Sequence, residues 1–130
     1  MDISYDIEPM DAQFIKQNPD LVLKERASIG INYLGFNNKK PPFDKKEVRQ
    51  AIAYAIDMPS IIEAVYMGGA KIADSPVPPG VPGHIYTGKS YDYNVEKAKE
   101  LLKQAGYPNG FKTKLSLNDK NVVKDVAVII

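Results

Sequence analysis

The sequence of 130 residues has no cysteine and no tryptophan, and its only histidine is His84. The absence of cysteine excludes disulfides, thiolate metal sites and cysteine nucleophiles, but it leaves the compartment open because exported proteins often lack cysteine too. His84 stands in a segment rich in Pro and Gly, without a second His or a paired carboxylate beside it. A metal site at this residue and a serine hydrolase triad built on it are therefore disfavoured.

Long apolar runs are missing as well. No stretch approaches the roughly 20 residues that a membrane span needs, and "MDISYDIEPM" lacks the basic and apolar regions of a secretion signal. Seventeen Lys and Arg are interleaved with sixteen Asp and Glu, which gives a net charge of +1. Because no basic stripe forms, we expect no nucleic acid partner, and because no long apolar run is present, we expect no direct membrane insertion of this segment.

The pattern that is present predicts one α/β unit with a modest core. A chain of this size buries roughly two thirds of the surface that it exposes when unfolded. β-Branched and aromatic residues at 20–28 and 29–37, and strict alternation at 111–118, predict strands, and 2–7 favours the end of another strand. The two-residue period places Tyr33 and Gly35 on one face of their strand.

Helix signals punctuate the rest of the chain. Pro9 suits the first turn of a short helix, and "PPFDKKEVRQAIAYAID" at 41–57 predicts a helix capped by Asp44, with Glu47 completing a capping box. Asp57 predicts the cap of a second helix directly after it.

Two more helices follow a segment of four prolines at 76–82, which predicts an extended surface loop. The amphipathic stretch 94–106 has Asn94 as its cap and Gly106 as its stop, with Val95, Ala98, Leu101, Leu102 and Ala105 turned inward. A last helix begins near Asn121 and shows no end signal before Ile130, so we expect the chain to be truncated within it.

These stretches together carry a resemblance. The runs "YLGFNNKKPPFDKKEVRQAIAYAIDMPSIIEAVYMGGA", "SPVPPGVPG" and "YDYNVEKAKELLKQAGYPNGFKTKLSLND" resemble the bacterial extracellular solute-binding protein family five, the dipeptide and oligopeptide receptors of ABC importers. The resemblance covers nearly the whole chain, in the order of the family. It implies that residues 1–130 are part of the C-terminal lobe of a two-lobed periplasmic-binding-protein (type II) fold, without the first lobe and without the signal sequence.

The resemblance also implies a function. Two lobes close on a small peptide by hinge motion and deliver it to the membrane permease of an ABC importer. Such receptors are periplasmic or extracellular, anchored as full-length lipoproteins, and are not enzymes; no cofactor is implied. Receptors of the same family for nickel chelates, haem or oligosaccharides stay open as alternatives.

Ligand-binding candidates come from the positions that match the family. Tyr33 and Gly35 match positions that face the ligand in oligopeptide-binding relatives, and Gly35 lacks the acidic side chain of some of them. Asn118 matches a contacting Asn, and Tyr5 and Asp6 match a turn that lines the cleft. Ordinary packing of Tyr33 and a plain turn role of Asn118 are the competing interpretations.

Two hypotheses from other classes complete the set. A protein-interaction module would display the proline-rich segment 76–82 to a partner. An accessory domain of a hydrolase would need a nucleophile and a base, which the residues do not supply.

Overall fold

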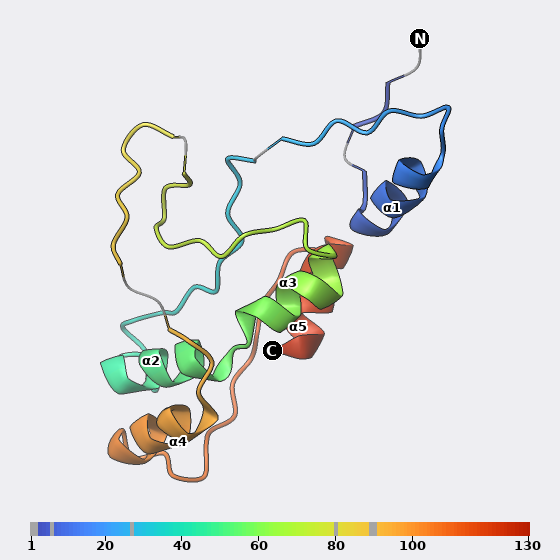
Figure 1. Cartoon of the computed structure of the whole chain (residues 1–130). Coiled ribbons are helices and arrows are strands. Elements are labelled where there is room, and N and C mark those ends of the chain that lie inside the picture. Colours follow the sequence, from blue (N-terminus) through green and yellow to red (C-terminus); the bar gives the residue numbers. More distant parts are fainter. Residues whose placement is uncertain (1–2, 6, 27, 80, 89–90) are drawn as a thin grey trace.

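The computed structural model describes residues 3–5, 7–26, 28–79, 81–88 and 91–130. Figure 1 shows helices joined by long extended segments, with α2 and α4 side by side, α3 beside α5, and α1 at the far end of the molecule. The helices of the described residues are α1 (Pro9–Gln17), α2 (Lys46–Ala55), α3 (Met58–Tyr66), α4 (Val95–Gln104) and α5 (Asn121–Ile129). Each lies where the sequence predicts a helix. None of those in the described ranges is long and apolar enough to cross a membrane.

The α2–α4 pair forms the core. Ala51 of α2 meets Ala98 and Leu101 of α4, and Tyr54 and Leu102 pack against this buried cluster. Small residues on both helices let the two backbones approach closely. The backbone N–H of the residue before α4, Asn94, donates to the Tyr54 carbonyl at the end of α2 (2.8 Å). The two helices are therefore antiparallel.

The opposite end of the pair is held by Lys45. Its Nζ donates to the Ala105 carbonyl just after α4 (2.6 Å) and lies 5.1 Å from the centre of the Tyr107 ring. A cation at this place complements the negative end of the α4 dipole. The start of α2 is thus tied to the end of α4 across sixty residues of sequence.

Both ends of α4 have the predicted caps. The Asn94 side chain accepts from the Lys97 N–H (2.9 Å), and Gly106 has φ +86°, the left-handed conformation that favours glycine. The Tyr107 N–H donates back to the Leu102 carbonyl (2.8 Å), which completes a Schellman ending. Val95 is 37% exposed, so its predicted inward position is wrong.

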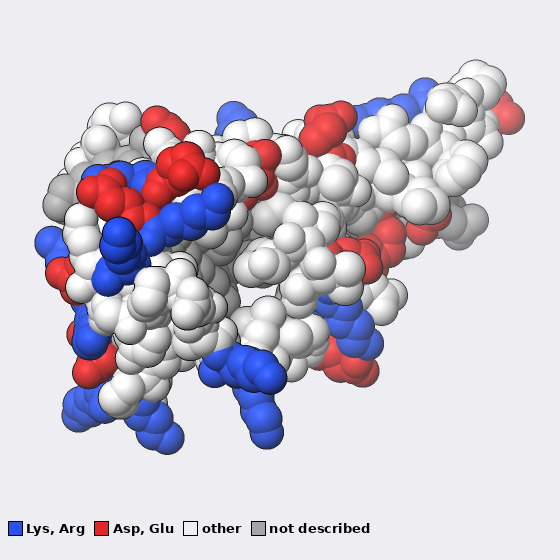
Figure 2. Space-filling model, turned by 90° about the horizontal axis from the view of Figure 1, so that it is seen from below, with Lys and Arg blue, Asp and Glu red and all other residues white. Residues whose placement is uncertain are grey.

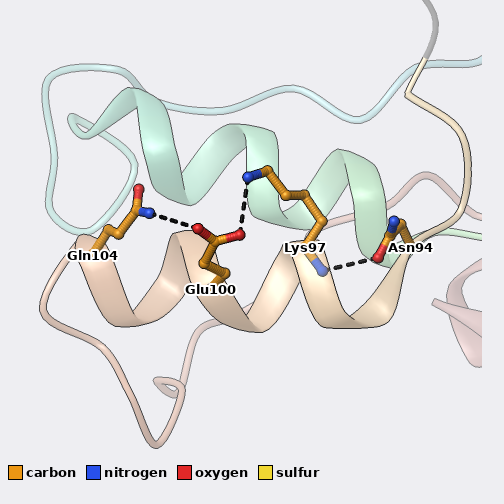
Figure 3. A network of polar contacts seen from close by, with 4 residues as sticks. All are labelled: Asn94, Lys97, Glu100 and Gln104. Atoms are coloured by element: carbon orange, nitrogen blue, oxygen red, sulfur yellow. Dashed lines mark hydrogen bonds and ion pairs between the residues drawn. The ribbon is translucent and has the colours of Figure 1, made fainter.

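The solvated side of α4 carries a short polar chain. Figure 3 shows Glu100 between its neighbours: it accepts from Lys97 (2.9 Å) with one carboxylate oxygen and from Gln104 (3.1 Å) with the other. Pairs three and four residues apart meet on a helix surface and add a few tenths of a kcal/mol each.

Helix α3 follows its sequence signals closely. The Asp57 carboxylate accepts from the Ser60 N–H (3.1 Å), Pro59 lies in the first turn, and Ile61 is buried. Helix α5 packs along α3.

The predicted start of α2 is wrong. The residue at the N-cap is Lys45, and no side chain caps the helix. The Asp44 N–H donates to the Lys40 carbonyl (3.2 Å), so Asp44 belongs to the preceding turn, one residue before the N-cap, and its carboxylate caps no N–H of α2. Instead, Nη1 of Arg49 reaches back to the carbonyls of Phe43 (2.7 Å) and Asp44 (3.1 Å).

The predicted strands do not form in the described residues. Segments 20–26, 28–37 and 111–118 have no ladder partner there, and neither do residues 3–5 and 7. A strand needs a neighbour that pairs with its N–H and C=O groups, and alternation of side chains cannot supply one. The α/β prediction is thus correct for the helices, while the strand segments run alone.

The proline-rich segment folds into consecutive turns and not into the predicted extended loop. The Val81 N–H donates to the Pro78 carbonyl (3.2 Å) and the His84 N–H to the Val81 carbonyl (3.0 Å). The His84 ring nitrogen Nδ1 lies 2.7 Å from the Val77 carbonyl oxygen, which closes the segment on itself.

Candidate functional site

Residues 31–36 keep the predicted alternation without being a strand. The Asn32 amide donates to the Tyr66 hydroxyl of α3 (2.8 Å), and the Phe36 ring stacks on Phe43 with centres 5.3 Å apart. The side chain between them in the sequence, Tyr33, is 86% exposed. One face of the segment is therefore fixed on the helices, and the other carries Tyr33 into solvent.

Gly35 stands on the same outward face as Tyr33. A Cβ built on Gly35 would lie 3.4 Å from the Tyr33 ring, so the ring lies over the glycine. The pair forms an exposed platform, an aromatic side chain beside bare backbone. A flat aromatic ring that lies over a glycine can contact an extended ligand by stacking.

Asn118 lies in the turn that leads into α5. Its side-chain oxygen accepts from the Lys120 N–H (3.3 Å), so Asn118 stabilises this turn, as one of the two interpretations of the sequence predicts. The residue is exposed. Tyr5 is 80% exposed. Asp6 lies outside the described residues.

Among the described members of the predicted set, a contact is found between Tyr33 and Gly35. No hydrogen bond or ring contact in the described part of the chain joins Tyr5, Tyr33 and Asn118 to one another. Ligand contact by these residues stays a prediction. Within the described ranges, no group of His, Asp and Glu is placed to hold a metal ion.

The sequence pattern does not predict a hollow that lies along α2. It has a volume of about 460 Å³, with Phe36 and Tyr91 as its aromatic walls and Lys46, Arg49, Gln50 and Ala53 along the helix. We call it the α2 hollow. The helical pattern of α2 by itself indicates only a solvated face. The second wall of the hollow comes from Tyr91, a residue distant in the sequence, whose ring packs on Tyr54 (centres 5.1 Å apart).

A second hollow, of about 430 Å³, lies among α1, α3 and α5 and is mainly apolar. Met10, Val65, Val122 and Val128 contribute to its lining. Figure 2 shows a face of the molecule on which Lys and Arg alternate with Asp and Glu, with white surface between them. Charges of both signs are thus spread over this face.

Comparison with known proteins identifies the family to which this chain belongs. The model of the bacterial extracellular solute-binding proteins, family 5 Middle, matches residues 1–130. The chain belongs to this family. The resemblance seen in the sequence is therefore confirmed.

Three similar proteins show the range of the family. Over 103 residues, 79% of this chain, it is 45% identical to heme-binding protein A of Haemophilus influenzae and 40% identical to the dipeptide-binding protein of Escherichia coli. The ABC transporter-associated periplasmic binding protein DppA from Helicobacter pylori, solved in complex with peptide STSA, superposes with a TM-score of 0.76 at 40% identity.

The superposition covers 82% of this chain and 21% of DppA. The chain spans 19% of the length of each of the two curated relatives. The helices and extended segments thus have the fold of one part of a periplasmic binding protein, which confirms the predicted fold class.

Proposed function

We propose that this chain is part of the C-terminal lobe of a two-lobed receptor that captures small peptides for an ABC importer. The observation that carries the proposal is the superposition, at 40% identity, on a binding protein solved with a bound peptide. The second lobe and the remaining cleft residues belong to the other four fifths of the relatives' length. The receptor is not an enzyme, and it works outside the cytoplasm as a lipoprotein that delivers its ligand to a membrane permease.

Within this receptor, the outward platform of Tyr33 and Gly35 contributes to the peptide site. An exposed tyrosine loses water-accessible surface when the lobes close on a ligand, and its two rotatable bonds keep the entropic cost low. Gly35 has no side chain, which lets the Tyr33 ring lie over the backbone and keeps the platform flat. Asn118, Tyr5 and Asp6 complete the proposed set.

A second ligand class is favoured by one specific observation. The relative with 45% identity is a haem-binding protein, whereas the two peptide-binding relatives named above are each 40% identical. Haem has a planar, largely apolar macrocycle on which an exposed tyrosine ring can stack. The described residues show no second feature that selects haem over peptide.

The experiment that separates these classes is calorimetric titration of the complete gene product with dipeptides, tripeptides and haemin. The proposal predicts saturable binding of at least one small peptide. When the protein has first been saturated with that peptide, a further titration should release no heat of binding. Saturable binding of haemin alone would transfer the proposal to haem. Binding of none of them would refute the receptor assignment for this ligand range.

A further inference from the structure

The α2 hollow has a charge composition that selects anions. Lys46 and Arg49 stand one turn apart on the same side of α2, and the residues that line the hollow include no Asp or Glu. Lys46 is exposed and Arg49 half-buried. The first turn of a helix also favours negative charge through its N–H dipoles.

Arg49 is held in place by the protein itself. Its Nη1 donates to the carbonyls of Phe43 (2.7 Å) and Asp44 (3.1 Å), whereas no protein acceptor is found for Nη2 and Nε within the described residues. The planar guanidinium is thus held through Nη1, and Nη2 and Nε remain available as donors to a ligand. A fixed fork of N–H groups matches the two oxygens of a carboxylate better than it matches a point charge.

The opposite wall adds neutral donors. Nε2 of Gln50 donates to the Tyr91 hydroxyl oxygen at 3.5 Å, a distance at the limit of a hydrogen bond, so this contact is weak. In the described chain the Tyr91 O–H has no acceptor, although its ring is fixed on Tyr54. Ala53 leaves the floor of the hollow open.

We propose that the α2 hollow is a second binding site of this chain, which takes a carboxylate between the Arg49 fork, the Lys46 ammonium and the Tyr91 hydroxyl. The site is distinct from the Tyr33–Gly35 platform. The ligand is a small dicarboxylate, and the aromatic walls of Phe36 and Tyr91 cover its methylene groups.

The first test uses glutarate and the ¹⁵N-labelled protein, with the uncharged diamide of glutaric acid as the control ligand. Glutarate is expected to shift the amide signals of residues 46–53 and 91 in a saturable way, and the diamide is not. The Kd for glutarate should rise about threefold in Lys46→Gln, where an exposed ion pair is lost. It should rise about tenfold in Arg49→Lys, where the fork is lost and the charge is kept.

Matched variants control for charge and fold. Lys114→Gln changes the net charge equally at an exposed residue that does not line the hollow and should leave the Kd unchanged. Tyr91→Phe keeps the packed ring, removes only the hydroxyl, and should raise the Kd about threefold. If Arg49→Lys fails to fold, Lys46→Gln and Tyr91→Phe still decide the matter. Equal Kd values in all variants, or shifts with the diamide as large as those with glutarate, would overturn the site.

The source of the carboxylate is resolved with a second probe. A peptide with two internal Glu residues, acetylated at one end and amidated at the other, has none of the free termini that a transported peptide presents. Tighter binding of this peptide than of glutarate would assign the hollow to a protein segment, and binding of glutarate alone would assign it to a free dicarboxylate. Binding of neither would end the proposal, while calorimetry with transported peptides tests the receptor function separately.

Discussion

Replacing Lys45 by methionine should loosen the end of α4 without touching its core. The substitution keeps the length of the side chain and removes the ammonium that donates to the Ala105 carbonyl (2.6 Å) and faces the Tyr107 ring. A hydrogen bond to a charged group contributes about 1.5 to 3 kcal/mol, and the cation–π contact about 0.5 to 1 kcal/mol at an exposed site.

The net loss is smaller than the sum of these contributions. The Lys45 residue is exposed, and water solvates both the freed carbonyl and the charge in the unfolded state. We expect about 1 to 2 kcal/mol of local stability to be lost, which corresponds to opening that is roughly 5 to 30 times more frequent.

Hydrogen exchange followed by mass spectrometry measures this opening directly. Peptides that cover residues 100–107 should exchange faster in Lys45→Met by the stated factor, while peptides from α3 should not change. Lys40→Met serves as the matched control, because the Lys40 side chain is exposed and makes no hydrogen bond, ion pair or cation–π contact in the described structure. Equal exchange in the two variants would refute the assigned role of Lys45.

The other predictions concern the core, a cap, the platform and the open apolar surface. Leu101→Ala removes a core side chain that is only 8% exposed and should cost about 2 to 3 kcal/mol in urea unfolding, whereas Val95→Ala should cost under about 0.5 kcal/mol; equal costs would contradict the core assignment. Asn94→Ala should lower the free energy of unfolding by about 1 kcal/mol through loss of the α4 cap, with Asn94→Ser restoring most of it. Tyr33→Ala should weaken peptide binding by the complete gene product about tenfold in calorimetry, whereas the control Tyr86→Ala, at another exposed tyrosine, should leave it unchanged. The isolated 130-residue chain, which exposes large apolar side chains on several elements, should self-associate in sedimentation; a strict monomer at high concentration would argue against this.

Local signals explain what could be predicted from the sequence. Asn94, Gly106 and Asp57 act within one turn of their own position, so a short stretch of sequence determines the helix ends that they make. The apolar stripe of α4 likewise predicted Ala98 and Leu101 as core residues.

Features that depend on distant partners could not be predicted. The strand segments have the right alternation, but only a neighbouring strand turns alternation into a sheet. Asp44 has the spacing of a capping residue and is diverted by a bond to Lys40 in the preceding turn. The α2 hollow exists because Tyr91, forty-one residues from Gln50, folds against α2.

The platform lies between these two cases. Alternation correctly placed Tyr33 and Gly35 on one face, and the family resemblance predicted which face meets the ligand. The structure shows that this face is open, through the contacts that Asn32 and Phe36 make on the other side.

The most direct test of the central claim is photo-crosslinking of the complete gene product with a dipeptide that carries a benzophenone side chain, followed by trypsin digestion and mass spectrometry. Tyr33 and Gly35 fall on the tryptic peptide 27–39, and Asn118 falls on 115–120. The account predicts label on peptide 27–39, and on 115–120 if Asn118 also contacts the ligand, with both signals lost in an excess of unlabelled dipeptide. If the label that unlabelled dipeptide suppresses were found only outside residues 1–130, the claim that this chain forms part of the peptide site would be contradicted.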